Sequence, residues 1–518
     1  MTDFVAHPRT FAQQFPDKPA LIMADSGATI TYRQLVENAD RAAQAFARLG
    51  LRQGDTIAIL LENQIRYPEL CWAAKNSGIT YVCVGSSLNI EDAAHIVQDS
   101  GAQLLISSQA LAETASGVAA LVRGIQYVMI DGAIEPFQSY EKLLVEELPI
   151  ALENRRRGPS MLYSSGTTGR PKGVRTPLPE APPEAPPARF PMLIQQYGFS
   201  PETVFVNPGP LYHAAPLRFM LSIMRAGGTV VGLRKFDALT TLHALQAHKA
   251  THALFVPTMF SRMLALPDSA KQGLDISSLR FAIHAAAPCP TGTKQAMIDW
   301  WGPIIYELYG GTEAVGHTFI NSEEWLSHKG SVGRPSSSCR MRIVDENGHD
   351  LPPMSPGLIY MSNGLRFEYH NDPEKTREAY LEGTWVTMGD IGYLDNDGYL
   401  YLTDRQSHMI ISGGVNIYPQ EAESILADHP AIVDVAVIGV PNEEFGEEVK
   451  AIVQPKTMPE NPDAMEEELI AYCRSRLSAI KCPRSVDFVV DLPRNEMGKL
   501  RKHVLKQKYW EGRGSLII

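Results

Sequence analysis

The chain has 518 residues, with 47 lysines and arginines against 58 acidic residues, and its formal net charge is −11 at pH 7. Hydrophobic residues make up 44% and charged residues 20%, a composition that excludes a disordered chain and a membrane-embedded bundle. The acidic balance argues against sequence-independent nucleic-acid binding, which needs a basic surface. The length exceeds the roughly 250–300 residues beyond which one core usually splits, so we expect at least two domains.

The cysteines and the N-terminal residues indicate in which cellular compartment the protein is expected. The six cysteines are scattered and form no C-x-x-C pair, which fits reduced thiols better than a zinc site or a disulfide framework. The first residues contain no apolar stretch of signal-peptide length, and 18 consecutive apolar residues occur nowhere in the chain. We therefore expect a soluble cytoplasmic protein with no membrane span.

Helical and extended patterns alternate through the first part of the chain. Apolar residues at helical spacing follow Tyr32, and Gly50 is a suitable C-cap. Strands are predicted at 55–63, 80–85 and 102–107, with helices at 65–78 and 91–101 between them. The same alternation returns between residues 200 and 310. This pattern predicts a large N-terminal α/β domain of two α/β subdomains with mostly parallel sheets.

The pattern changes after about residue 330. Turn signals at Asn347–Gly348 and Asp397–Gly398 predict antiparallel strands and a small β-barrel. Beyond Arg405 the sequence predicts a small α+β unit. Its expected elements are a helix at 419–428, strands at 433–440 and 450–455, a helix at 464–479 and a strand at 486–490. We place the domain boundary near 404–407, which gives domains of 1–404 and 405–518.

A proline-rich stretch, residues 176–191, interrupts the first domain. Its composition predicts an extended surface arm.

The most informative local sequence is SSGTTGRPKGV, which follows Tyr163. Its backbone N–H groups and hydroxyls can surround phosphate oxygens, and Lys172 can add a positive charge. It is not a Walker A sequence. On composition alone, a Gly/Ser-rich linker is an equal alternative. The candidate phosphate-binding residues are Ser164, Ser165, Gly166, Thr167, Thr168, Gly169 and Lys172.

Five further segments follow this loop in chain order. They are Tyr309-Gly310-Gly311-Thr312-Glu313, Trp385 to Asp390, Asp404-Arg405, Ser412 to Pro419, and Pro493 to Lys499. Together with the loop they resemble the motifs of the adenylate-forming superfamily, which includes the acyl-CoA synthetases. The resemblance covers nearly the whole chain.

The resemblance implies a role for each segment. The loop and the 309–312 segment would hold ATP, and Glu313 would approach its Mg²⁺, which offsets the repulsion between a carboxylate and a triphosphate. Asp390 would accept hydrogen bonds from the ribose hydroxyls, and Arg405 would contact ribose or phosphate. Lys499 would reach the α-phosphate and the acyl carboxylate during adenylation. Further site residues implied by the resemblance are His213 as a gate of the acyl pocket, Ala286 and Ala287 in the adenine and acyl pocket, and Gly413 and Gly414 beside the pantetheine tunnel of CoA.

Residue type alone leaves alternatives open for several of these positions. Glu313 taken alone reads as a solvated loop acid, and Lys499 lies in a basic tail where lysines are usually solvated. His213 could be a packed core histidine.

The chain also departs from the family pattern at three places. His284 and Ala285 stand where Ser and Gly are usual, Ser407 stands at the hinge where Asp or Lys is usual, and the arm replaces a T-H motif.

The resemblance implies that the protein converts a carboxylic acid and ATP to acyl-AMP, and then to acyl-CoA. The small domain would rotate about Ser407 between the two half-reactions. Small candidate pocket residues, and no acid near His213 to pair with an α-ammonium group, favour a fatty, aryl or bulky hydrophobic acid. Open alternatives are an acyl-AMP ligase that loads a carrier protein or an amine, and a catalytically silent nucleotide-binding homologue. A kinase or NTPase is disfavoured because its motifs are missing. The oligomeric state, monomer or homodimer, stays open.

Overall fold

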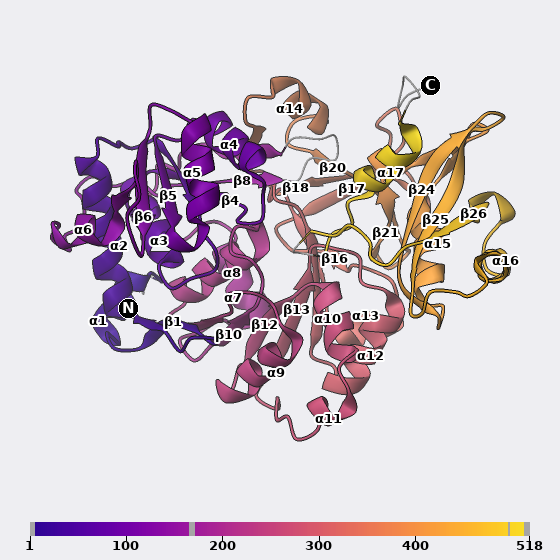
Figure 1. The fold of residues 1–518 in the computed structure, drawn as a ribbon, viewed down its shortest axis with the longest axis horizontal. Coiled ribbons are helices and arrows are strands. Elements are labelled where there is room, and N and C mark those ends of the chain that lie inside the picture. The colour runs from indigo at the N-terminus through magenta and orange to yellow at the C-terminus, as the bar shows by residue number, and fades with distance from the viewer. Residues whose placement is uncertain (1–5, 165–170, 496–497, 512–518) are drawn as a thin grey trace. The chain divides into compact units, whose positions relative to one another are not determined.

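The structure is a computed structural model that describes residues 6–164, 171–495 and 498–511. The chain forms two compact units, and each combines segments that are distant in the sequence. Unit 1 comprises Met1–Phe255, Ala265–Ile283 and Arg366–Arg377, and unit 2 comprises Val256–Leu264, His284–Leu365 and Glu378–Ile518. Residue 404 lies inside unit 2, and the domain division at 404/405 stays a prediction. Figure 1 labels the elements of both units.

The first sheet of unit 1 has the strand order β19-β9-β8-β4-β3-β5-β6-β7. Its pairs from β8 through β4, β3, β5 and β6 to β7 are parallel, whereas β8–β9 and β9–β19 are antiparallel. The three strands predicted in this region are confirmed. The strands are β3 (Thr56–Leu60), β4 (Thr80–Val84), β5 (Leu104–Ser108), β6 (Gln126–Ile130), β7 (Gln138–Ser139), β8 (Ser160–Ser164), β9 (Lys172–Arg175) and β19 (Glu368–Tyr369).

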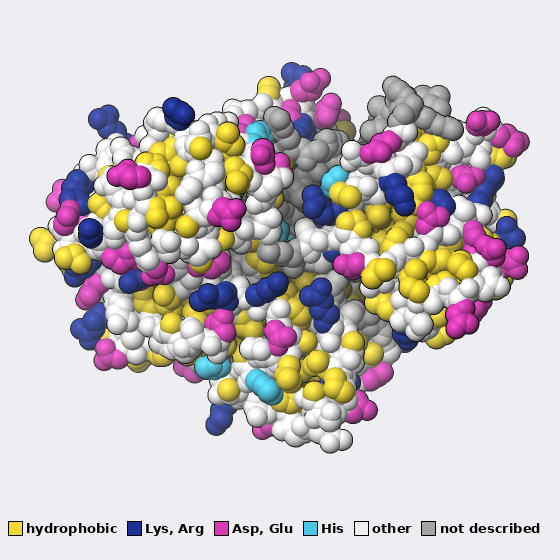
Figure 2. Space-filling view, viewed as in Figure 1, with side chains coloured by type: hydrophobic (Ala, Val, Ile, Leu, Met, Phe, Trp, Pro, Cys, Tyr) yellow, Lys and Arg dark blue, Asp and Glu magenta, His cyan; other side chains and the backbone are white. Residues whose placement is uncertain are grey.

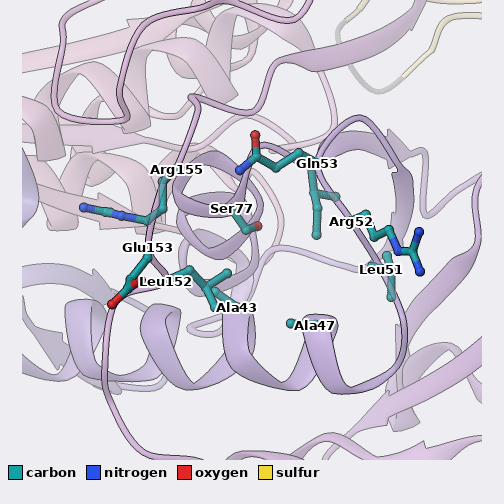
Figure 3. Close-up of a pocket in the computed structure, with 10 residues that line it drawn as sticks. Ala43, Ala47, Leu51, Arg52, Gln53, Ser77, Leu152, Glu153 and Arg155 are labelled. Atoms are coloured by element: carbon teal, nitrogen blue, oxygen red, sulfur yellow. The ribbon is translucent and has the colours of Figure 1, made fainter.

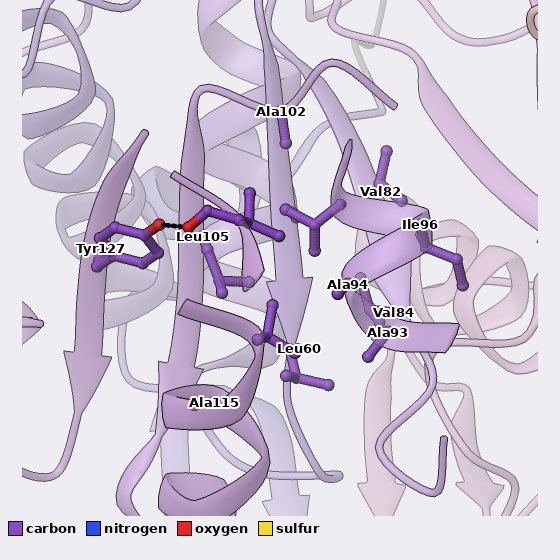
Figure 4. Packing of buried hydrophobic residues seen from close by; sticks show 14 of the residues in the cluster. Leu60, Val82, Val84, Ala93, Ala94, Ile96, Ala102, Leu105, Ala115 and Tyr127 are labelled. Carbon is purple, nitrogen blue, oxygen red and sulfur yellow. Dashed lines mark hydrogen bonds between the residues drawn. The ribbon is translucent and has the colours of Figure 1, made fainter. Parts of the chain in front are cut away.

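Both faces of this sheet are buried. Along β3, Ala58 and Leu60 alternate with Ile57 and Ile59, and all four side chains are inaccessible to solvent, as expected for a parallel sheet covered on both sides. Figure 4 shows the face of the sheet that carries Leu60, packed against apolar residues of α4 and α5. The helices here are α1 (Pro8–Gln14), α2 (Tyr32–Arg48), α3 (Tyr67–Ser77), α4 (Ile90–Asp99), α5 (Ala112–Leu121) and α6 (Tyr140–Val145).

A second sheet of unit 1 runs β12-β10-β11-β1-β2. Its pairs are parallel except β1–β2, so the expected second α/β subdomain is confirmed. Its strands are β1 (Pro19–Met23), β2 (Thr29–Thr31), β10 (Val204–Asn207), β11 (Thr229–Gly232) and β12 (His252–Phe255). The accompanying helices are α7 (Phe190–Tyr197), α8 (Ala214–Arg225), α9 (Ala238–Ala247) and α11 (Asp268–Lys271).

Residues 176–189 of the predicted proline-rich arm contain no helix or strand but include turns, with Ala185 donating to the Pro182 carbonyl and Phe190 to the Pro187 carbonyl. The prediction of an extended arm over 176–191 was wrong at its end, because Phe190 and Pro191 begin α7. Three arginines hold the arm in unit 1. Arg225, the last residue of α8, donates to the carbonyl oxygens of Ala6, Pro183 and Glu184 at 2.8–2.9 Å. Arg155 donates to the Glu184 carboxylate at 2.7 Å, and Arg157 donates to the Ala185 carbonyl at 2.6 Å. Proline has no N–H group, so a proline-rich chain offers mainly acceptors, which guanidinium groups satisfy.

Unit 2 opens with a short antiparallel arrangement. Strand β14 (Ile305–Gly310) pairs with β15 (His317–Ile320), which pairs with β16 (Arg334–Pro335). The strand β13 (Phe281–Ala285) ends at the start of this unit, and the helices are α10 (Pro257–Leu264), α12 (Thr291–Trp301) and α13 (Ser322–Ser327).

The region predicted as a small β-barrel is a four-stranded antiparallel sheet of order β17-β18-β20-β21. The Asp397–Gly398 turn joins β20 and β21 as expected. The Asn347–Gly348 turn also forms, but in the described residues it is followed by a single bridge, between Val344 and Asp350. Strand β17 pairs instead with β18, which lies further along the chain. The elements are β17 (Arg340–Val344), β18 (Gly357–Ser362), β20 (Val386–Leu394), β21 (Leu400–Arg405) and α14 (Pro373–Ala379), of which residues 373–377 are assigned to unit 1.

The C-terminal part of unit 2 is an α/β fold with the strand order β23-β22-β25-β24, in which β26 pairs with β25. Its predicted helices and strands are all confirmed, with ends that differ by a few residues. The five predicted elements are α15 (Pro419–Ala427), β24 (Ile432–Asn442), β25 (Gly446–Pro455), α16 (Pro462–Arg474) and β26 (Ser485–Phe488). The sequence analysis did not predict β22 (Ile410–Ser412), β23 (Val415–Ile417) or α17 (Lys502–Trp510).

Acidic and basic side chains are interspersed over the face shown in Figure 2. None of the helices in the described part of the chain has the length and hydropathy that crossing a membrane requires.

Replacing Arg225 by Met should destabilise the protein by about 2 kcal/mol, because three carbonyl groups, one buried and two partly buried, lose their donor. Thermal unfolding measures the loss, and limited proteolysis should cut first within residues 176–189. The exposed Arg123 is the matched control, and Arg123→Met should leave the unfolding temperature unchanged. Equal stability of the two variants would show that the arm is not held by Arg225.

Candidate active site

The centre of the candidate site in unit 2 is the carboxylate of Asp390. Asp390 on β20 and Arg405 on β21 are directly paired in the sheet, and Arg405 Nε lies 3.0 Å from Asp390 Oδ1. From the end of β14, the Tyr309 hydroxyl donates to Asp390 Oδ2 at 2.7 Å. Asp390 is only 7% exposed. Each carboxylate oxygen has a second lone pair, so the held carboxylate can still accept from two vicinal hydroxyls.

Mutual electrostatics tie Arg405 and Tyr309 to the same carboxylate. Burial lowers the pKa of Arg405, but the negative charges of Asp390 and Glu313 raise it, and the net shift is upward. Burial, and next the Asp390 charge, raise the pKa of Tyr309 well above its ordinary value. Arg405 therefore stays protonated and Tyr309 stays a neutral hydrogen-bond donor.

Local hydrogen bonds fix the backbone of Lys499. Its N–H donates to Asn495 Oδ1 at 2.9 Å, and its carbonyl accepts from the Asn495 N–H at 3.0 Å. Arg494, paired with Asp434, forms a bridge with Leu500. Gly498 has a φ of +68°, a conformation that favours glycine. This backbone conformation explains why a glycine precedes Lys499 in the predicted G-K pair. Glu496 and Met497 lie outside the described residues.

The side chain of Lys499 lies within the electrostatic reach of the Asp390 cluster. Burial, and next the Arg405 charge, lower the pKa of Lys499 to about 8, whereas Asp390 and Glu313 pull it upward. Unit 2 therefore brings together five residues that the sequence placed in the site, which are Tyr309, Glu313, Asp390, Arg405 and Lys499. Two cations and two carboxylates in one place suit a ligand that is itself anionic.

The loop after β14 is tightly built around Glu313. A Cβ atom on Gly311 would lie 2.5 Å from Glu313 Oε2 and 2.1 Å from Met388 Sδ, so a larger residue here would displace the ends of both side chains. Ala314 has a φ of +56°, and its carbonyl accepts from Asn363 Nδ2 at 2.7 Å. A carboxylate oxygen is a ligand that Mg²⁺ prefers, so Glu313 fits a magnesium-binding role. Gly310 ends β14 opposite His317, and Thr312 is half-buried in the loop.

The segment after β13 turns outward. His284 and Ala285 are buried, whereas Ala286 is exposed and Ala287 is half-buried. Ala286 has a φ of +76°, which is strained for a residue with a Cβ atom, and such strain gathers at functional sites.

In unit 1, the predicted phosphate loop joins β8 and β9. Five of its candidates, Ser165, Gly166, Thr167, Thr168 and Gly169, lie outside the described residues. Ser164 ends β8 and pairs with Lys172 at the start of β9. The Lys172 ammonium donates to Asp372 at 2.5 Å, and this contact lowers the pKa of Asp372. Sequence reasoning missed Asp372, which lies 200 residues away and belongs to no motif.

His213 directly precedes α8, also in unit 1. It is half-buried, and its ring centroid lies 4.4 Å from that of Tyr212. The helix that follows is apolar and largely buried. Both interpretations of His213, the pocket gate and the packed histidine, remain predictions.

The predicted glycine pair forms the tip of the hairpin between β22 and β23. Gly413 and Gly414 have φ values of +57° and +79°, as a type I′ turn requires at both central positions. Gly413 also donates its N–H to the Phe445 carbonyl at 2.8 Å.

The predicted hinge residue Ser407 is exposed, and it lies in the sequence between Asp404 and His408, which contact each other. His408 Nδ1 lies 3.3 Å from Asp404 Oδ1, and the N–H of Gln420 at the start of α15 donates to Asp404 Oδ2 at 2.9 Å. Burial raises the pKa of Asp404, but its bond with His408 and the nearby Lys502 lower it, and the net shift is downward. The sequence identified Asp404 only as part of a motif, without these partners.

Figure 3 shows a separate cavity of about 190 Å³ in unit 1, between α2 and the segment around Arg155. None of its lining residues is a predicted site residue.

The chain was compared with known proteins. It matches the family described as AMP-binding enzyme over residues 8–365, and the family described as AMP-binding enzyme C-terminal domain over residues 421–499. A feruloyl-CoA synthase of Amycolatopsis is 32% identical over 493 residues, which are 95% of this chain and 96% of that protein. A long-chain-fatty-acid–CoA ligase of Mycobacterium tuberculosis is 30% identical over 502 residues, with 95% and 96% covered. The ATP-bound crystal structure of MatB from Rhodopseudomonas palustris has a TM-score of 0.83 and 27% identity, over 98% of this chain and 99% of that one.

The chain therefore belongs to the AMP-binding enzymes, the adenylate-forming family that includes acid–CoA ligases. The resemblance drawn from the motifs and the α/β fold class are both confirmed.

Lys499 would act in its protonated form. The release of pyrophosphate that requires the carboxylic-acid substrate should therefore fall as the pH rises through about 8, the pKa of Lys499. Thioester formation from supplied acyl-AMP does not need this charge and should show no such fall. Stopped assays of each half-reaction across this range make the comparison. A pyrophosphate profile that stays flat from about pH 7 to about pH 9 would contradict the role of the ammonium group.

Proposed function

We propose that the protein is an AMP-forming acid–thiol ligase that converts a hydrophobic carboxylic acid, ATP and CoA to acyl-CoA, AMP and pyrophosphate. The observation that carries the proposal is the gathering of Lys499, Arg405, Asp390, Tyr309 and Glu313 in unit 2. The family relationship supports ATP and a carboxylic acid as substrates.

In the first half-reaction, a carboxylate oxygen attacks the α-phosphorus of ATP, and the bond from that phosphorus to the β-phosphate bridging oxygen breaks. The reactants are both anions, so catalysis depends chiefly on charge neutralisation and in-line positioning. Lys499 would neutralise charge on the α-phosphate and on the attacking carboxylate, and Arg405 would add charge at the nucleotide. Asp390 would orient the nucleotide through the ribose hydroxyls. Lys172 and the 164–169 loop are proposed to hold the outer phosphates.

Glu313 would hold Mg²⁺, which neutralises triphosphate charge when bound. The support is the carboxylate itself and the glycine that makes room for it at position 311.

In the second half-reaction, the CoA sulfur attacks the acyl-AMP carbonyl carbon, the bond to the phosphate oxygen breaks, and AMP leaves, while the thiol proton goes to solvent. We propose that residues after the hinge at Ser407 rotate, withdraw Lys499 and bring Gly413 and Gly414 to the acyl-AMP. The exposed position of Ser407 and the projecting β22–β23 hairpin are compatible with this rotation.

The acid is proposed to have a fatty, aryl or otherwise bulky hydrophobic tail. The helix that follows His213 contributes buried apolar residues, and no acidic residue stands in the 210–216 segment to pair with an α-ammonium group. Relatives at about 30% identity are named for ferulic acid and for long-chain fatty acids. The six cysteines are free, which supports a reducing, cytoplasmic location.

Two alternatives share this fold. An acyl-AMP ligase would pass the acyl group to a carrier protein or an amine, and a silent homologue would bind nucleotide without reaction. Pyrophosphate and AMP release from a panel of fatty and aryl acids, with and without CoA, separates the three. We expect AMP turnover that needs CoA and no carrier protein. Turnover only with a carrier protein or amine would favour the first alternative, and no pyrophosphate with any acid would favour the second.

Lys499→Ala should lower the rate of adenylation by roughly 10²-fold or more, because a charge that stabilises the transition state is lost. Thioester formation from supplied acyl-AMP should be reduced much less. Lys508→Ala, in the same basic tail, is the matched control and should keep both rates. An equal loss of both half-reactions in Lys499→Ala would contradict the assigned role.

A further inference from the structure

Three titratable side chains are buried together close to the Asp390 cluster in unit 2. Lys294 on α12 is fully buried, and its ammonium lies 2.6 Å from Glu307 Oε2 on β14. His284 on β13 is also fully buried, with Nε2 at 3.6 Å from the same oxygen. The Lys294 ammonium also lies 4.9 Å from the ring centroid of Trp325. None of these four residues carries a role in the chemistry described above.

The ion pair of this group is the contact between Lys294 and Glu307. Burial, and next the Lys294 charge, lower the pKa of His284 well below its ordinary value, so its ring is neutral. Burial raises the pKa of Glu307, although Lys294 opposes the shift. A buried ion pair contributes little net stability, because desolvation offsets the attraction between the charges. Its directional contact can still fix the relative position of two elements, here α12 and β14.

Strand β14 links this pair to the nucleotide-binding carboxylate. Glu307 and Tyr309 are two residues apart on the strand, so their side chains leave from the same face. Glu307 pairs with Ile320 and Tyr309 with Thr318 across the β14–β15 ladder. The Tyr309 hydroxyl in turn donates to Asp390. An anchor at Glu307 therefore limits how the last residues of β14 can shift or twist.

We propose that Lys294 and Glu307 are a positioning pair for the nucleotide, which holds the end of β14 so that Tyr309 stays hydrogen-bonded to Asp390. This role rests on the proposed function of Asp390 as the ribose-binding residue. The pair would act on the nucleotide through Tyr309, whose hydroxyl donates to Asp390.

The test separates stability from positioning. Lys294→Met and Glu307→Gln each leave one buried group without its partner and should lower the unfolding temperature. The double variant Lys294→Met/Glu307→Met has neither buried charge and should regain most of that temperature. AMP binding by calorimetry should nevertheless be weakened about tenfold in the double variant, the size of losing a hydrogen bond to a charged group. The KM for the acid should change less than twofold.

Tyr309→Phe tests whether the pair acts through Tyr309 or only through stability. It should weaken AMP binding to a similar extent, and adding it to the double variant should produce no further loss, because the changes act through one contact. Arg9→Met breaks the Arg9–Asp40 pair between α1 and α2 in unit 1. As the control, it should lower stability without changing AMP affinity.

Two outcomes would overturn the proposal, and they are distinguishable. Normal AMP affinity in the double variant, or losses that add with Tyr309→Phe, would remove the positioning role and leave the proposed function intact. No AMP binding by the unmodified protein would overturn the proposed function, and the positioning role with it.

Discussion

The Asp390 carboxylate, held from one side by Tyr309 and from the other by Arg405, is the contact on which the candidate site depends. The three residues come from β14, β20 and β21, which belong to two different sheets. A short acid can bind a diol only if its plane is fixed, and here two donors fix it before a nucleotide arrives. Preorganisation of this kind removes an ordering cost from binding. The loop that carries Glu313 and the segment that carries Lys499 are arranged around this carboxylate.

An acidic chain that must bind anionic substrates faces an electrostatic conflict, which unit 2 resolves locally. The whole chain has a net charge of −11, yet Lys499 and Arg405 lie close enough to lower the pKa of the lysine. Asp390 and Glu313 keep both cations protonated near neutral pH and stop the repulsion from becoming prohibitive. An anionic ligand would relieve the remaining repulsion between the two cations, and this is the physical reason to expect tight nucleotide binding there.

Sequence patterns predicted the helices and strands well and selected candidate site residues, but they did not predict the contacts of those residues. Buried parallel strands such as β3 and β4 have continuous apolar runs, and the resemblance of the motifs to a known family selected Asp390, Arg405 and Lys499 as candidates. Pairs between distant segments left no local signal. The pairs Lys172–Asp372 and Lys294–Glu307 are examples, because the sequence around each acid gives no sign of which lysine it contacts. Likewise, the proline composition predicted that residues 176–189 form no helix or strand, but it did not predict the Arg225 side chain that binds them.

The most direct test of this account is the pKa of Lys499, measured by NMR titration of protein labelled with ¹³C at lysine Cε and assigned with Lys499→Arg. The account predicts a value of about 8. Asp390→Asn should lower it further, because a favourable charge is lost, and Arg405→Met should raise it, because a repulsive charge is lost. A value near the ordinary 10.5 that neither substitution moves would show that Lys499 does not belong to the Asp390 cluster and would contradict the central claim.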